Sequence, residues 1–262
     1  MVDDPIFTAL IGLAAMFLLI ILQVPVGIAM GVIGVIGTGL IIGFEPALTL
    51  LATEPSAAMA AEGLAVIAMF LLMGNLAHTG GLSDELYRLA YVFLGHRRGG
   101  LIFATIGACA GFGAVCGSSV ATAATMAKIA LPQMLARGYA KSLAAGAIAS
   151  GGTLGMIIPP SVVMILYAIL TENSIIALFL AAIIPGLLAV IFYFISIAIT
   201  VRIKPELAPL GERVEWRERR QVARSSWAII LLAFVVSGGI YSGIFTVSEA
   251  AAVGASIAFF LA

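Results

Sequence analysis

Apolar segments follow one another along most of this chain, and they are close to the length that a membrane requires. A helix that spans a bilayer needs about 20 apolar residues, and such segments occur near residues 6–22, 26–44, 64–77, 174–201 and 227–244. Charged residues make up 10% of the sequence, against about 25% in soluble domains. Because lipid offers no hydrogen bonds to the backbone, such segments form helices. We therefore expect an all-α polytopic membrane protein. The net charge of zero gives no reason to expect nucleic acid as a partner.

Two short segments interrupt the apolar sequence with glycines and hydroxyl side chains. The first runs from Gly111 to Ser119, and the second runs from Ser150 to Ser161. Irregular polar backbone at membrane depth is tolerated where it is buried in protein or lines a cavity. We therefore expect these two segments to form the functional centre of the chain.

The basic residues decide the expected topology. Apart from Lys128, they fall in three groups within residues 88–98, 137–141 and 202–224, whereas the loop at 45–62 carries carboxylates and no Lys or Arg. Positively charged loops stay on the cytoplasmic side of a membrane. We therefore place the three basic groups in the cytoplasm and the N-terminus outside.

In this topology the segment 99–136 begins and ends on the same side of the membrane. Its roughly 38 residues suffice for two helices that each cross part or most of the bilayer, and its middle is Gly117-Ser118-Ser119. The economical interpretation is a re-entrant helical hairpin with its tip at these three residues. The alternative is two full spans joined by a short outside loop.

A discontinuous helix is expected over residues 142–170. Its interruptions are predicted at Gly151–Thr153 and at Pro159-Pro160. Two consecutive prolines remove backbone donors, and each ring clashes with the preceding turn of a helix. The hairpin and this broken helix together hold both of the unusual segments.

Two charged segments are predicted to be amphipathic surface helices. The first is Ser83–Leu94, with Ser83 as its N-cap and acidic residues in the first turn. The second is Val214–Arg224, which lies in the long charged linker, and Trp227 follows it as an interfacial anchor.

The two interruptions supply oxygen ligands without a carboxylate. These are the carbonyls of Val115, Cys116, Gly117, Gly151 and Gly152 and the hydroxyls of Ser118, Ser119 and Thr153. Unwound carbonyls at helix C-termini attract cations, and such ligands suit Na⁺ better than a divalent ion. The predicted Na⁺ site comprises Cys116, Gly117, Ser119, Gly152 and Thr153, and no organic cofactor is expected. The alternative is that the glycines serve packing and the hydroxyls bond to their own helices.

Structural explanations are preferred for the other unusual residues in apolar segments. Lys128 is expected to anchor its helix by reaching the interface, with contact to a substrate as the alternative. Glu249 follows Thr246 by three residues, which is the spacing of a capping box. Cys109 and Cys116 are expected to be small buried hydrophobes.

A series of longer motifs runs through the chain: Gly117–Thr125, Leu131-Pro132, Arg137–Tyr139, Gly151–Gly155, Ile158–Ser161, Leu170–Glu172 and Thr246–Ala252. These motifs closely resemble the large membrane subunit of tripartite ATP-independent periplasmic (TRAP) transporters, in the ion-transporter-like superfamily. One departure is that Val247 and Ser248 stand near a position where the family usually has a proline.

The resemblance implies a sodium-coupled secondary importer of organic acids such as C4-dicarboxylates or sialic acid, embedded in the membrane lipid of the cytoplasmic (inner) membrane of a bacterium or archaeon. Its implied partners are a small four-helix membrane subunit and a periplasmic solute-binding protein. It also implies an elevator mechanism and two inverted repeats, each with a re-entrant hairpin and a broken helix. The chain would hold the first repeat, and half of the substrate site, at Ser118, Ser119, Pro159 and Pro160.

On this basis we divide the chain into four parts. They are scaffold helices with an interfacial helix (1–98), a transport core with the hairpin at 99–136 and the broken helix at 142–170 (99–173), a return helix with a charged linker (174–226), and the truncated start of a second half (227–262).

There are three alternative functions. A stand-alone sodium/carboxylate symporter would lack the small membrane partner, and a fragment would not transport. An intramembrane serine protease with Ser118 or Ser119 as nucleophile would need a base nearby. The two histidines, His78 and His96, lie at a helix end and in a basic loop, which argues against this function.

The hairpin topology predicts that cysteines placed at Gly99 and at Ala136 react with a membrane-impermeant thiol reagent from the cytoplasmic side only. The measurement is labelling in sealed, oriented vesicles, with the two native cysteines replaced. Labelling of either position from the outside would contradict the hairpin and favour two full spans.

Overall fold

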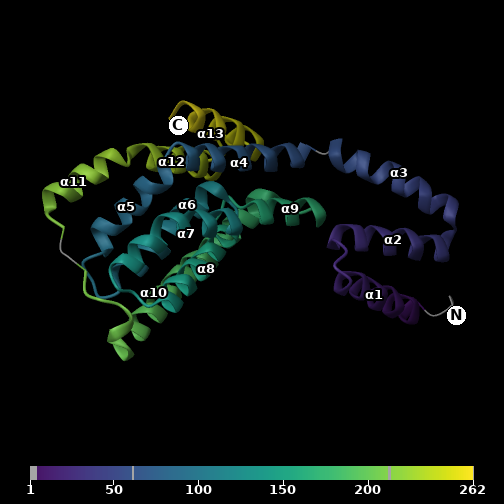
Figure 1. Ribbon diagram of the computed structural model, residues 1–262. Coiled ribbons are helices and arrows are strands. Elements are labelled where there is room, and N and C mark those ends of the chain that lie inside the picture. Colours follow the sequence, from purple (N-terminus) through teal and green to yellow (C-terminus); the bar gives the residue numbers. More distant parts are fainter. Residues whose placement is uncertain (1–4, 61, 212–213, 262) are drawn as a thin grey trace. The chain divides into compact units, whose positions relative to one another are not determined.

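The computed structural model describes residues 5–60, 62–211 and 214–261, and the regular secondary structure in these ranges is helical (Figure 1). The helices form two compact units, Met1–Ala61 and Glu62–Ala262, which we describe separately. Within the described part of the chain, α10 (Ile175–Ile203) alone is long and apolar enough to cross a membrane. Counting each of three sharply bent helix pairs as one span raises that number to four.

The first unit consists of three helices: α1 (Pro5–Ile21), α2 (Val26–Ile42) and α3 (Phe44–Ala60). The prediction of a polar loop at 45–62 is wrong, because α3 occupies nearly all of these residues. Three hydroxyl groups in α3 donate to backbone carbonyls three or four residues earlier. The donor–acceptor distance is 3.0 Å for Thr49, 2.9 Å for Thr53 and 2.7 Å for Ser56. The helix therefore satisfies its own polar side chains.

The second unit begins with a bent pair, α4 (Glu62–Thr79) and α5 (Leu82–Leu94), whose axes differ by 67°. The surface helix predicted here is confirmed as a helix, but its predicted cap is wrong. Gly81 occupies the N-cap position in a left-handed conformation, and Ser83 is buried with its hydroxyl 3.3 Å from Nδ1 of His78.

The helical hairpin predicted at 99–136 is confirmed as α6 (Gly100–Cys116) and α7 (Ser119–Ala136). Its re-entry into the membrane stays a prediction. The helix α6 is buried along most of its length and packs against α4, α5, α7 and α8. A helix that is apolar on all sides is stable only when it is surrounded by protein or lipid, so α6 is the centre of this unit.

The discontinuous helix predicted at 142–170 is confirmed as α8 (Lys141–Ile157) and α9 (Val162–Leu170), with a bend of 44°. The break lies at the prolines. The other break predicted in this helix, at Gly151–Thr153, is wrong, because α8 continues through these residues. Their glycines serve close packing: a methyl group on Gly151 would lie 2.7 Å from Sγ of Cys109.

The remaining helices are α10, the single 3₁₀ turn η1 (Pro205–Leu207), α11 (Trp216–Ser225), α12 (Trp227–Tyr241) and α13 (Val247–Leu261). The capping box predicted for α13 is confirmed. The backbone N–H of Thr246 donates to Oε2 of Glu249 at 2.8 Å, and the N–H of Glu249 donates to Oγ1 of Thr246 at 3.2 Å.

The linker at residues 204–211 ties together both ends of the hairpin. The N–H of Gly99, before α6, donates to the carbonyl of Pro209 at 3.3 Å. The N–H of Ala140, after α7, donates to the carbonyl of Leu207 at 3.0 Å. Tyr139 adds a third bond, since its hydroxyl accepts from the N–H of Leu101 at 3.3 Å. The chain after α10 therefore closes the base of the hairpin.

The substitution Gly113→Ala tests the close packing of α6 on α8. A methyl group on Gly113 would lie 2.7 Å from Cα of Gly155, and backbone cannot move aside as a flexible side chain can. We expect a loss of about 1–3 kcal/mol in stability, as for overpacked cores, measured as thermal unfolding in detergent. The matched control is Gly146→Ala on α8, which meets open space and should stabilise the helix by roughly 0.5–1 kcal/mol. Equal effects of the two substitutions would contradict the packing.

Candidate functional site

The tip of the hairpin meets the break in the neighbouring helix through the backbone. Gly117 ends α6 with a φ of +64°, a conformation that glycine adopts without strain. Its carbonyl accepts a hydrogen bond from the N–H of Val162, the first residue of α9, at 3.1 Å. A methyl group on Gly117 would lie 3.0 Å from the carbonyl oxygen of Pro160. The two interruptions recognised in the sequence are therefore in direct contact.

Hydroxyl side chains close the helix ends around this contact. Ser118 is the N-cap of α7 and accepts from the N–H of Ala121 at 3.4 Å. Ser161 donates its hydroxyl to the carbonyl of Met156 at 2.7 Å, near the end of α8. In the described part of the chain, the carbonyls of Val115 and Cys116 have no hydrogen-bond partner. Free carbonyls thus remain at the C-terminal end of α6.

Thr122 is a site residue that the sequence reasoning missed. Its side chain is fully buried, and its hydroxyl has no hydrogen-bond partner among the described residues. A methyl group on Gly155 would lie 2.9 Å from this hydroxyl and 2.9 Å from the carbonyl of Ser118. Buried polar groups are normally hydrogen-bonded, so this oxygen is available to a ligand. Its position one turn after Ser118 was the available signal.

The residues proposed on the broken helix divide between two neighbours. Gly152 faces the hairpin, where an added methyl group would lie 3.1 Å from the carbonyl of Ser119. The hydroxyl of Thr153 instead donates to the carbonyl of Ser150 at 2.7 Å and lies 2.9 Å from the hydroxyl of Tyr193 on α10. Both residues lie inside α8, so neither carbonyl belongs to an unwound segment.

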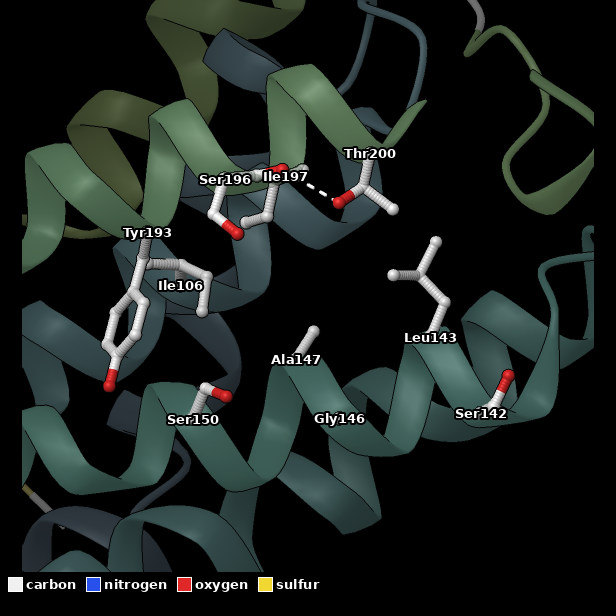
Figure 2. Close-up of a pocket in the computed structure, with 10 residues that line it drawn as sticks. All are labelled: Ile106, Ser142, Leu143, Gly146, Ala147, Ser150, Tyr193, Ser196, Ile197 and Thr200. Carbon is white, nitrogen blue, oxygen red and sulfur yellow. Dashed lines mark hydrogen bonds between the residues drawn. The ribbon is translucent and has the colours of Figure 1, made fainter. Parts of the chain in front are cut away.

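Tyr193 belongs to a pocket of about 150 Å³ between α8 and α10. Figure 2 shows hydroxyl groups from both helices directed toward the space between them, from Ser142, Ser150, Ser196 and Thr200. The hydroxyl of Thr200 is bonded to the carbonyl of Ser196 at 2.8 Å. Thr153 is therefore linked, through the hydroxyl of Tyr193, to a residue that lines this pocket.

The two prolines occupy different surroundings. The carbonyl of Pro160 faces Gly117, whereas Pro159 lines an apolar pocket of about 440 Å³ together with Gly111, Gly186 and Tyr241. The peptide bond between the prolines is cis. Among the four residues predicted to contact substrate, Ser118, Ser119 and Pro160 lie around the tip, and Pro159 points to the apolar side.

Lys128 lines a separate pocket of about 390 Å³ between α4 and α7. Asn75, His78 and Thr125 share this pocket, and Oγ1 of Thr125 lies 3.5 Å from Nδ1 of His78. His78 thus contacts Ser83 and Thr125 and is not bonded to the serines of the tip.

The junction can act on ions without any charged side chain. The C-terminal ends of α6 and α8 and the N-terminal ends of α7 and α9 meet within a few residues of one contact. Helix C-termini carry partial negative charge and N-termini carry partial positive charge. Such a junction can stabilise a cation at the carbonyls and an anion at the N–H groups, which defines a membrane transport protein more readily than an enzyme.

A comparison with protein-family models shows to which family of transport proteins this chain belongs. The model described as "Tripartite ATP-independent periplasmic transporter, DctM component" matches residues 13–262. The chain belongs to this family, which consists of inner-membrane permeases and not of enzymes, and the resemblance read from the motifs is confirmed.

Curated relatives agree with the family assignment. The C4-dicarboxylate TRAP transporter large permease protein DctM of Vibrio cholerae is 42% identical over 200 residues, which are 76% of this chain and 44% of the relative. The ectoine TRAP transporter large permease protein TeaC of Halomonas elongata is 31% identical, over 92% of this chain and 56% of its own. The isethionate TRAP transporter permease protein DctMQ of Oleidesulfovibrio alaskensis is 33% identical, over 96% of this chain and 39% of the relative. The chain spans about half the length of the curated relatives it matches.

Proposed function

We propose that this chain forms part of the permease subunit of a sodium-coupled, binding-protein-dependent importer of organic acids. The observation that carries the proposal is the hydrogen bond between Gly117 and Val162, which joins a hairpin tip to a broken helix. The family assignment supports a transport function. The elevator mechanism, the inverted repeats and the four-part division of the chain are also proposals.

Sodium is the proposed coupling ion, and the junction offers it neutral oxygen ligands. The set of ligands predicted from the sequence is Cys116, Gly117, Ser119, Gly152 and Thr153. The free carbonyl of Cys116 and the closeness of Gly152 to Ser119 support this set. The bonds of Thr153 to Ser150 and Tyr193 place its hydroxyl on the α10 side, and we add the unpartnered hydroxyl of Thr122 to the set.

The proposed substrate is an organic acid such as a C4-dicarboxylate or sialic acid, in contact with Ser118, Ser119, Pro159 and Pro160. A relative named for C4-dicarboxylates supports this class. The names of other relatives, for ectoine and isethionate, show that the family covers several small polar solutes. The proposed partners are a small four-helix membrane subunit and a periplasmic solute-binding protein. A stand-alone symporter would transport without either partner.

The first test is the double variant Ser119→Ala, Thr153→Ala in the complete transport system. We expect the Na⁺ concentration for half-maximal uptake in proteoliposomes to rise about tenfold or more, since two neutral ligands at roughly 0.5–1.5 kcal/mol each are lost. The matched control is Ser142→Ala, which removes an exposed hydroxyl on α8, the helix that carries Thr153. Unchanged Na⁺ dependence with normal expression would remove these residues from the ion site.

The second test is Thr122→Val, which replaces the buried hydroxyl with a methyl group of similar shape. Because this hydroxyl has no protein partner, its loss should leave the unfolding temperature in Na⁺-free detergent unchanged or slightly raised. The stabilisation gained on adding Na⁺ should fall, because binding to the folded state raises apparent stability. A variant that loses stability without Na⁺ and keeps the full response to Na⁺ would show that Thr122 only serves packing.

A further inference from the structure

The helix α11 presents two chemically different faces. On one face Val222 is buried, and this helix packs against α5. Arg88 of α5 lies 3.8 Å from Glu218, and Ser226 donates its hydroxyl to the carbonyl of Glu85 at 3.3 Å. These contacts fix which side of α11 faces the protein, and Figure 1 shows α11 running on into α12.

The opposite face of α11 carries three arginines and Trp216, and Trp227 follows at the start of α12. Arg217, Arg220 and Arg224 recur at spacings of three and four, which places them on one side of a helix, and all three are exposed. Trp216 and Trp227 are 59% and 56% exposed. The guanidinium of Arg220 lies 5.4 Å from the ring centre of Trp216. We call these five residues the Arg–Trp face.

The carboxylates of this segment lie away from the Arg–Trp face. Glu218 is one turn, and Glu215 two turns, before the buried Val222, so the helical repeat of 3.6 residues puts both near the side that packs on α5. The outer face therefore keeps three positive charges without an acidic neighbour on its own helix. From α5, the neighbouring charge Arg88 is already engaged by Glu218.

The position of α11 relative to the membrane follows from its neighbour. The apolar helix α12 begins at Trp227, separated from the end of α11 at Ser225 by one residue, and the two axes differ by 52°. Tryptophan concentrates at the boundary between hydrocarbon and headgroups. A tryptophan at each end is the pattern expected of a helix at the level of the lipid headgroups.

We propose that the Arg–Trp face binds the phosphate groups of anionic phospholipids. Arginine pairs with phosphate oxygens through its planar fork of donors, and the tryptophan rings fit the apolar side of the headgroup layer. Each basic residue near an anionic surface adds about fivefold to the preference for it. This proposal needs the membrane location of the chain and does not rest on the transported ion or substrate.

Trp216 and Trp227 are the two tryptophans of the sequence, so tryptophan fluorescence reports on this face alone. The chain is reconstituted in nanodiscs that contain either brominated phosphatidylglycerol or brominated phosphatidylcholine, over the same series of mole fractions. We expect the anionic lipid to quench at a mole fraction at least about tenfold lower than the neutral lipid. The difference should shrink in 1 M salt, where the screening length falls to about 3 Å.

The test variant is R217Q/R220Q/R224Q, and it should abolish the difference between the two lipids. The matched control is R97Q/R202Q/K204Q, which removes three exposed cations elsewhere and should keep the difference. Circular dichroism and the quenching by neutral lipid verify that each variant is folded and inserted. Equal quenching by both lipids in the unchanged chain would overturn the proposal, and so would a preference that persists in the test variant. Tryptophans that no lipid quenches would indicate a protein partner on this face and would overturn it as well.

Discussion

The hydrogen bond from Val162 to Gly117 is the contact on which the rest of the second unit depends. It joins the end of α6 to the start of α9, so each interruption in an apolar segment supplies the partner for the other. Such a contact requires the two backbones to approach closely, and glycine makes this possible at Gly113, Gly117 and Gly155. Because lipid cannot hydrogen-bond a broken helix, the two breaks are stable only together. In the same unit α6 is buried among its neighbouring helices along most of its length.

The predictions from sequence succeeded where local chemistry decides the structure. The two consecutive prolines at 159–160 remove backbone donors and mark the break after α8, and Thr246 with Glu249 forms a capping box from residues three apart. The hairpin was found from the distribution of basic residues around an apolar segment, and the helix–turn–helix at 100–136 agrees with it.

The predictions failed where tertiary contacts decide. Gly151 and Gly152 suggested an unwound segment, but they allow α8 to approach Cys109 and Ala123 without leaving the helix. The helix α3 was missed because its polar residues bond to their own backbone. Thr122 was missed because a threonine in an apolar helix normally bonds one turn back. Only the packed structure reveals that its hydroxyl has no partner.

The linker at 204–211 has a mechanical consequence. Its carbonyls bind the backbone just before α6 and just after α7, so the hairpin cannot spread at its base without breaking bonds to a third segment. The two legs of the hairpin are therefore held at one end by backbone bonds to a segment more than 60 residues further along the chain, so separating them there costs hydrogen bonds as well as packing.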